Sequence, residues 1–238
     1  MVADGRRLDE LVCVPTVVRG RDGRRRGVGL VWGRPTDDGV VDARRPLPVL
    51  VAVHRVVAAV THAFTDGRNT APKSGADFLG QLEATTADAG TGHVATVCGR
   101  YYAMDRDENW DRTKRAYDAI VNREAPHSAG SAVGAVEAAY DRGETDEYVE
   151  PTLVGDHDGL ADGDAAVFCN FRADRARQLT RMLADIEPGE WHAEGIDTAP
   201  PDVELVTMTE YDETFDLPVA FPPEEPEATL GEVLSEAG

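Results

Sequence analysis

Apolar runs alternate with amphipathic segments from Val60 onward. Four runs have the length and content of buried strands, namely 60–64, 93–99, 165–168 and 203–212. Helical spacing of apolar residues marks the segments between them, at 76–88, 111–124, 131–144 and just after Phe171. Strands that alternate with helices predict βαβ units. We therefore expect an α/β fold with a mainly parallel sheet flanked by helices.

The first 59 residues differ from the rest in pattern and charge. The stretches 20–27 and 33–48 are rich in Gly, Arg, Pro and Asp, and no sustained periodicity precedes 48–53. One interpretation is a basic arm for an acidic partner. The simpler interpretation is an irregular or foreign segment, and a shifted reading frame would produce such a segment. The predicted division is 1–59, a main domain over 60–216, and a linker with the start of a helix over 217–238.

The charge balance restricts the partners of the chain. The formal net charge is −20, with 44 acidic against 24 basic residues, and Lys73 and Lys114 are the only lysines. Such a surface repels nucleic acid and anionic membranes, so we expect neither as a partner. An acidic, lysine-poor composition is also typical of a salt-loving cytoplasm, although ordinary acidic proteins share it.

Targeting signals are not evident in the sequence. The longest apolar stretch, 46–64, carries His54 and Arg55 near its middle, and a central arginine is costly in a bilayer. The arginine-bearing N-terminus has no apolar segment of the kind found in signal peptides. We expect a cytoplasmic protein without a membrane span.

Arginines follow three of the predicted strands. In FCNFRADRARQLTR (168–181), Arg172 and Arg175 come at a strand-to-helix turn, where the helix dipole and two guanidinium forks suit an anion. Spacing alone leaves open a solvated basic turn paired with Asp174. However, Arg68 follows 60–64, and Arg100 and Arg106 follow 93–99. Because the carboxyl ends of parallel strands share an edge, the pattern favours one phosphate or carboxylate site.

Long motifs in the chain resemble the cofactor-independent, or 2,3-bisphosphoglycerate-independent, phosphoglycerate mutase family. The resemblance covers 60–238 and is carried by HAFTDGRNTAPKSG (62–75), TVCGRYYAMDRDENWDRTKRAYDAIV (96–121), DGDAAVFCNFRADRARQLT (162–180), TMTEYD (207–212) and VAFPPE (219–224). It implies a two-domain isomerase of the alkaline phosphatase superfamily, in which a phosphatase-like domain carries a serine and two Mn²⁺ ions. The matched part is the inserted, glycerate-binding domain, and 217–238 is the linker that begins the return to the phosphatase-like domain.

The resemblance also implies the function of the residues. The family interconverts 2-phosphoglycerate and 3-phosphoglycerate in glycolysis and gluconeogenesis through a phosphoserine intermediate, as a cytoplasmic monomer. By the family's pattern, the substrate contacts are Arg68, Asn69, Arg100, Arg106, Arg172 and Arg175. Several planar forks suit a substrate that carries both a carboxylate and a phosphate.

Departures from the family pattern limit what this chain does alone. Asn69 stands where the family usually has aspartate, which removes a charge and any general-base capacity. The family's serine segment and metal-binding motifs have no counterpart, so no catalytic or metal residue is assigned. We expect the isolated chain to be inactive unless a second chain complements it. The alternative is a non-catalytic phosphoglycerate-binding remnant of a broken gene. A nucleotide-binding oxidoreductase is disfavoured because no strand precedes a G-x-G-x-x-G motif.

Overall fold

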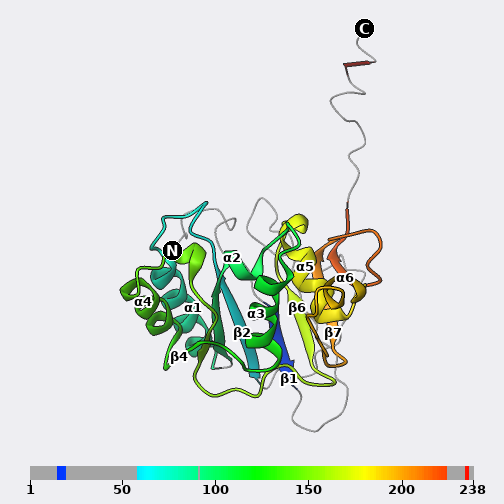
Figure 1. The fold of residues 1–238 in the computed structure, drawn as a ribbon. Helices are drawn as coiled ribbons and strands as arrows, with labels where there is room; N and C mark the ends of the chain where they lie inside the picture. The colour runs from blue at the N-terminus through cyan, green and yellow to red at the C-terminus, as the bar shows by residue number, and fades with distance from the viewer. Residues whose placement is uncertain (1–14, 20–57, 91, 224–233, 236–238) are drawn as a thin grey trace.

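A mixed sheet of eight strands forms the centre of the molecule (Figure 1). The structure is a computed structural model, which describes residues 15–19, 58–90, 92–223 and 234–235. The order across the sheet is β4-β5-β3-β2-β1-β6-β7-β8. The bounds are β1 Pro15–Arg19, β2 Ala58–Thr65, β3 His93–Gly99, β4 His127–Ala129, β5 Thr152–Val154, β6 Ala165–Phe168, β7 Glu204–Thr209 and β8 Val219–Phe221.

Five of these strands run in one direction. β2 and β3 are parallel, as are β6, β7 and β8, whereas β1 pairs antiparallel with both β2 and β6 and thereby gives the two groups a common direction. β4 and β5 run the opposite way. The mainly parallel α/β sheet that the sequence predicts is confirmed. The carboxyl ends of β2, β3 and β6 consequently lie at one edge.

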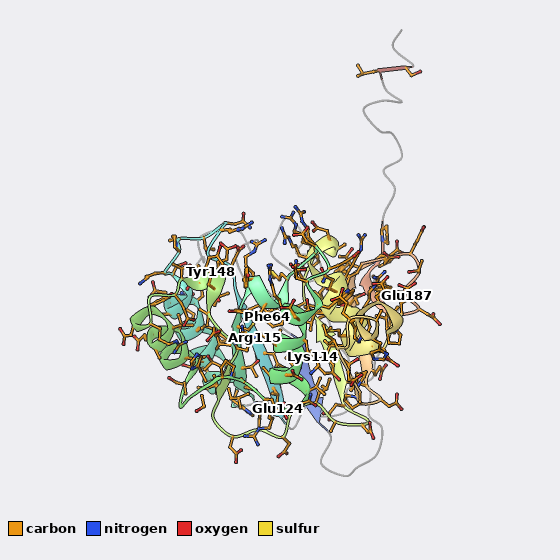
Figure 2. The ribbon with its side chains drawn as sticks, viewed as in Figure 1. Phe64, Lys114, Arg115, Glu124, Tyr148 and Glu187 are labelled. Carbon is orange, nitrogen blue, oxygen red and sulfur yellow. The ribbon has the colours of Figure 1, made fainter. Side chains whose placement is uncertain are left out.

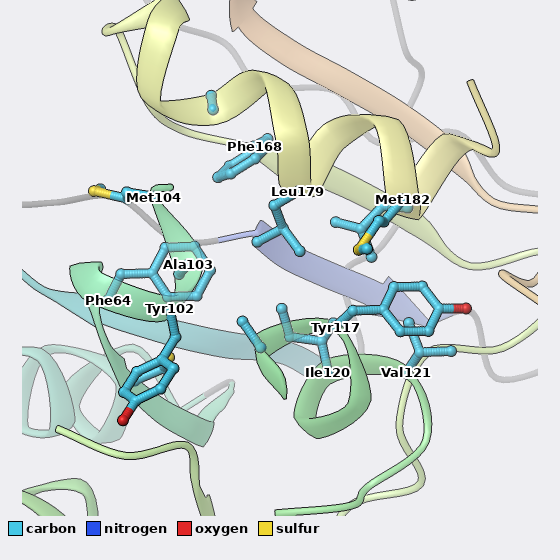
Figure 3. Packing of buried hydrophobic residues seen from close by; sticks show 14 of the residues in the cluster. Phe64, Tyr102, Ala103, Met104, Tyr117, Ile120, Val121, Phe168, Leu179 and Met182 are labelled. Carbon is cyan, nitrogen blue, oxygen red and sulfur yellow. The ribbon is translucent and has the colours of Figure 1, made fainter. Parts of the chain in front are cut away.

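Helices cover the two faces of the sheet. Their bounds are α1 Gly75–Ala89, α2 Arg100–Ala103, α3 Trp110–Val121, α4 Ala132–Asp141, α5 Ala173–Ala184 and α6 Gly189–His192, with a 3-10 turn, η2, at Asp146–Tyr148. On one face α1 and α4 pack on a cluster that includes Ala63 and Val97. On the other face, α2, α3, α5 and α6 pack on a cluster that includes Phe64 and Phe168 (Figure 3). Consecutive residues of β2, Ala63 and Phe64, thus point to opposite faces, as strand geometry requires.

Some elements differ from the sequence prediction. β1 lies inside the first 59 residues, where the sequence pattern predicted no strand, and the apolar run at 48–53 falls outside the described residues. The loop predicted from Arg100 begins with α2, and the connector predicted over 217–226 contains β8. These elements contain only three to five residues each, too few to show a period. Of the helix predicted over 229–238, only 234–235 are described.

No helix in the described part of the chain combines the length and apolar character needed to cross a bilayer.

Candidate functional site

Asp66 organises the turn that follows β2. Its carboxylate accepts hydrogen bonds from the backbone N–H of Arg68 at 3.1 Å and from Nδ2 of Asn69 at 2.9 Å. It also pairs with the guanidinium of Arg100, which is 7% exposed at the end of β3. Burial acts to raise the pKa of Asp66, but the hydrogen bond and charge of Arg100 outweigh it, so the pKa is lowered. The ends of β2 and β3 are therefore joined by a buried ion pair.

Two glycines bring these strand ends against η2. Gly99 contacts the backbone of Glu147 so closely that an added Cβ would overlap it, and Gly67 has φ +67° with a Cβ position 2.6 Å from the Glu147 nitrogen. Only glycine fits such approaches without strain. The contact places the Glu147 carboxylate 2.6 Å from Nε of Arg68. Arg68 is therefore held at the rim while 56% of its side chain stays exposed.

Asp174 organises the turn that follows β6. Arg172 is the N-cap residue of α5, and its backbone N–H donates to Oδ1 of Asn170 at 2.8 Å. Nε of Arg172 donates to Oδ1 of Asp174 at 2.8 Å, and Nη1 of Arg106 donates to Oδ2 of the same carboxylate at 2.9 Å. Hydrogen bonds from Arg172 and Arg106 hold the pKa of Asp174 at about 2. The carboxylate is thus ionised at all pH values above that range.

Arg175 joins α5 to the segment that follows α2. Its Nη1 donates to the Met104 carbonyl at 3.1 Å, and its Nε is buried without a hydrogen-bond partner. Burial lowers the pKa of Arg175, and the positive charges of Arg106 and Arg100 lower it further. Repulsion of this kind requires guanidinium groups that lie close together. Arg175 therefore links α5 to Met104, two residues before Arg106.

We call Arg68, Arg100, Arg106, Arg172 and Arg175 the arginine rim. The rim contains five positive charges against the three carboxylates of Asp66, Glu147 and Asp174, so it is locally positive in a chain of net charge −20. Nitrogen-bearing side chains gather at the upper edge of the molecule in Figure 2, whereas Glu124 lies at the opposite edge. Positive charge concentrated against an acidic background suits a small anion.

The predicted site residues lie around one edge of the sheet, but they differ in what they offer a ligand. Arg106 and Arg172 are about half exposed, whereas Arg100 is buried on Asp66. The amide nitrogen of Asn69 is turned toward Asp66. Sequence reasoning assigned no role to Asp66 or Glu147. The signal available for Asp66 was its position, because it directly follows β2 and lies in the same turn as Arg68.

A group of metal-ligating side chains occurs beside β4 and β5. Among the described residues, His127, Glu144 and Glu150 place one donor atom each within 4.8 Å of the others. Glu150 is already bonded to Arg115 at 2.6 Å and Glu144 to Arg142 at 2.5 Å. These arginines compensate both carboxylates, and a hydrogen bond from Arg115 lowers the pKa of Glu150. One charge-balanced group of three does not fit the pair of Mn²⁺ ions implied by the family resemblance.

The structure belongs to the class of α/β domains with arginines gathered at the carboxyl edge of the sheet. The family model described as BPG-independent PGAM N-terminus matches residues 46–213. The chain belongs to this family. The match begins upstream of Val60, the start predicted from the sequence motifs.

Several relatives carry the name 2,3-bisphosphoglycerate-independent phosphoglycerate mutase. The protein from Natronomonas pharaonis is 66% identical over 219 residues, covering 91% of this chain and 42% of its own length. Those from Haloarcula marismortui and Halobacterium salinarum are 62% and 59% identical. The Haloarcula match covers 91% of this chain and the Halobacterium match 86%, and each covers 41% of the relative. The chain thus spans about two-fifths of the length of these curated relatives. The 219 matched residues are more than 60–238 contains, so the similarity includes part of the first 59 residues.

A solved structure is similar in fold. Leishmania mexicana phosphoglycerate mutase, crystallised at low cobalt concentration, superposes with a TM-score of 0.60 at 29% sequence identity. The match covers 69% of this chain and 32% of the Leishmania chain. The likeness therefore concerns a part of the larger enzyme.

Proposed function

We propose that this chain binds 2-phosphoglycerate and 3-phosphoglycerate as the substrate-binding part of a cofactor-independent phosphoglycerate mutase. One observation carries the proposal: Arg106, which follows β3, and Arg172, which follows β6, share the carboxylate of Asp174, and the Asp66–Arg100 ion pair joins the ends of β2 and β3 at the same edge. The names of the curated relatives support the choice of substrate.

The chemistry of the substrate matches the rim. Phosphoglycerate has a carboxylate at C1 and a phosphate at C2 or C3, so it needs at least two anion contacts close together. Arg68, Arg106 and Arg172 each keep about half of the side chain exposed. Guanidinium groups bind such oxyanions through paired N–H donors and hold them in one orientation. Orientation is the contribution that a mutase needs from a binding domain, because the phosphoryl group must return to the neighbouring hydroxyl.

Binding of 3-phosphoglycerate to Arg172→Ala tests this function. Losing hydrogen bonds to a charged group costs about 1.5–3 kcal/mol, so the Kd measured by calorimetry should rise roughly 10- to 150-fold. Arg123→Ala is the matched control, because Arg123 also pairs with one aspartate, Asp156, at 2.9 Å but lies away from the rim. Equal affinities of Arg172→Ala and the wild type would contradict the proposal.

The isolated chain is expected to bind without turnover. The described residues do not provide the paired metal sites, and the resemblance leaves the serine without a counterpart in this sequence. An assay of 3-phosphoglycerate conversion with added Mn²⁺ should therefore give no product, and addition of a complementing phosphatase-like chain should restore it. Turnover by the purified 238-residue chain alone would show that catalysis does not require the complementing phosphatase-like chain.

A further inference from the structure

Asp174 uses the donor edges that an anion would use. Its Oδ1 accepts from Nε of Arg172 at 2.8 Å, and its Oδ2 accepts from Nη2 of the same guanidinium at 3.3 Å. The two contacts form a fork-to-fork pair on the Nε–Nη2 edge of Arg172. The same Oδ2 also accepts from Nη1 of Arg106 at 2.9 Å. One carboxylate therefore holds two arginines that are 66 residues apart in the sequence.

The geometry of a guanidinium limits how many anions it can bind. Each planar edge accommodates one bidentate oxyanion, and carboxylate and phosphate oxygens have similar spacing. An anion that binds Arg172 on the Nε–Nη2 edge must therefore replace the Asp174 carboxylate there. Asp174 has 35% of its side chain exposed, and Arg106 and Arg172 have 47% and 57%, so the pairs are accessible to such an exchange.

We propose that Asp174 is an internal competitor of the anionic ligand, a carboxylate that occupies the Nε–Nη2 edge of Arg172 together with Nη1 of Arg106 and so lowers the affinity of the site. The proposal rests on the proposed function in that it concerns the same arginines, but it holds for any oxyanion that they bind. Removal of the negative charge of Asp174 should therefore strengthen binding of the anion. Removal of a residue that contacts the ligand would have the opposite effect.

Other carboxylates at the rim differ from Asp174 in this respect. Asp66 is buried with Arg100, so its exchange with a ligand would leave a charge in the interior. Glu147 contacts Arg68 through a single oxygen at 2.6 Å, which leaves the remaining N–H groups of that fork available. Asp174 alone among these three combines a bidentate contact with exposure of both partners. It is therefore the residue on which competition depends most.

The test measures binding of sulfate, a probe that stays a dianion across the working pH range, by calorimetry at one fixed ionic strength. Exposed ion pairs contribute about 0.2–1 kcal/mol each, so Asp174→Asn, which removes the pairs with both Arg106 and Arg172, should tighten sulfate binding about 2- to 30-fold. Asp156→Asn is the matched control because it removes the same charge from the Arg123 pair at the opposite edge. It should leave sulfate affinity unchanged, and thermal unfolding checks that each variant is folded.

A second background separates competition from general electrostatics. The Arg172→Ala variant lacks the guanidinium edge for which Asp174 and sulfate compete. Adding Asp174→Asn to this variant should therefore give only a small part of the increase in sulfate affinity seen in the wild-type background. If the Asp174 charge acted only through space, the full gain in sulfate affinity would persist in the Arg172→Ala background, and that result would overturn the proposal. Unchanged, weaker or absent sulfate binding by Asp174→Asn alone would also overturn it. Sulfate that binds and tightens as expected, with no binding of 3-phosphoglycerate, would instead refute the proposed function alone.

Discussion

Carboxylates determine where the arginines of the rim point. Asp66 holds Arg100 in the interior, and Asp174 and Glu147 hold Arg172 and Arg68 at the surface. The arginines could be predicted from the sequence because they directly follow apolar runs. The pairing of Asp66 with Arg100 could not, because it depends on which strands become neighbours. Asn69 also turned out to donate to Asp66, a contact that its position in the motif did not reveal.

The substitution Asp66→Ala should strongly lower the free energy of unfolding of the chain. The substitution leaves the buried Arg100 guanidinium without its partner, and an uncompensated buried charge costs about 3–5 kcal/mol. Chemical denaturation followed by circular dichroism measures the loss in the free energy of unfolding. Asp156→Ala removes a carboxylate that is 95% exposed and should cost at most about 1 kcal/mol. Similar losses for the two variants would refute the structural role of the Asp66 ion pair.

Elements marked by an apolar run between turn residues or by a helical period were predictable, and short elements without such a pattern were not. β3 and β6 have the bounds that their apolar runs predicted, and α1 differs from its prediction by one residue at each end. By contrast, β4 and β8 contain three residues each, and their strand character comes from pairing with β5 and β7. β1 likewise depends on its two antiparallel neighbours for its place in the sheet. Tertiary pairing, not local pattern, creates such strands.

A capping contact between elements is the feature of α1 that can be tested. Oδ2 of Asp146 accepts from the backbone N–H groups of Ser74 and Gly75 at 2.9 and 2.8 Å, and Oδ1 pairs with the Tyr140 hydroxyl. Asp146→Ala should lower the free energy of unfolding by about 1–3 kcal/mol, because buried donors lose their acceptor. Hydrogen exchange should accelerate at the first turn of α1.

Asp77→Ala is the control for that prediction. Asp77 is an exposed acidic residue in the same first turn, so its removal tests the charge without the capping hydrogen bonds. Its cost should stay below about 1 kcal/mol. Equal costs would mean that the helix dipole, and not the hydrogen bonds of Asp146, accounts for the effect.

For the whole molecule, charge is the dominant property. A net charge of −20 on 238 residues produces self-repulsion that salt screens, and the Debye length falls from about 10 Å at 0.1 M to about 3 Å at 1 M. We therefore predict that the unfolding temperature rises with KCl concentration and that most of the rise occurs below about 1 M. Thermal unfolding at several KCl concentrations measures this, with equally concentrated sucrose as an uncharged control. A flat response to KCl would exclude adaptation of this surface to salt.

The central claim is that arginines from separate strand ends bind one phosphoglycerate. A crystal structure of the chain with 3-phosphoglycerate tests it most directly. We predict a single ligand at the carboxyl edge of the sheet, with guanidinium nitrogens of Arg68, Arg106 and Arg172 within about 3.2 Å of its oxygens. A ligand bound at another surface, or one that contacts only a single arginine of the rim, would contradict the account.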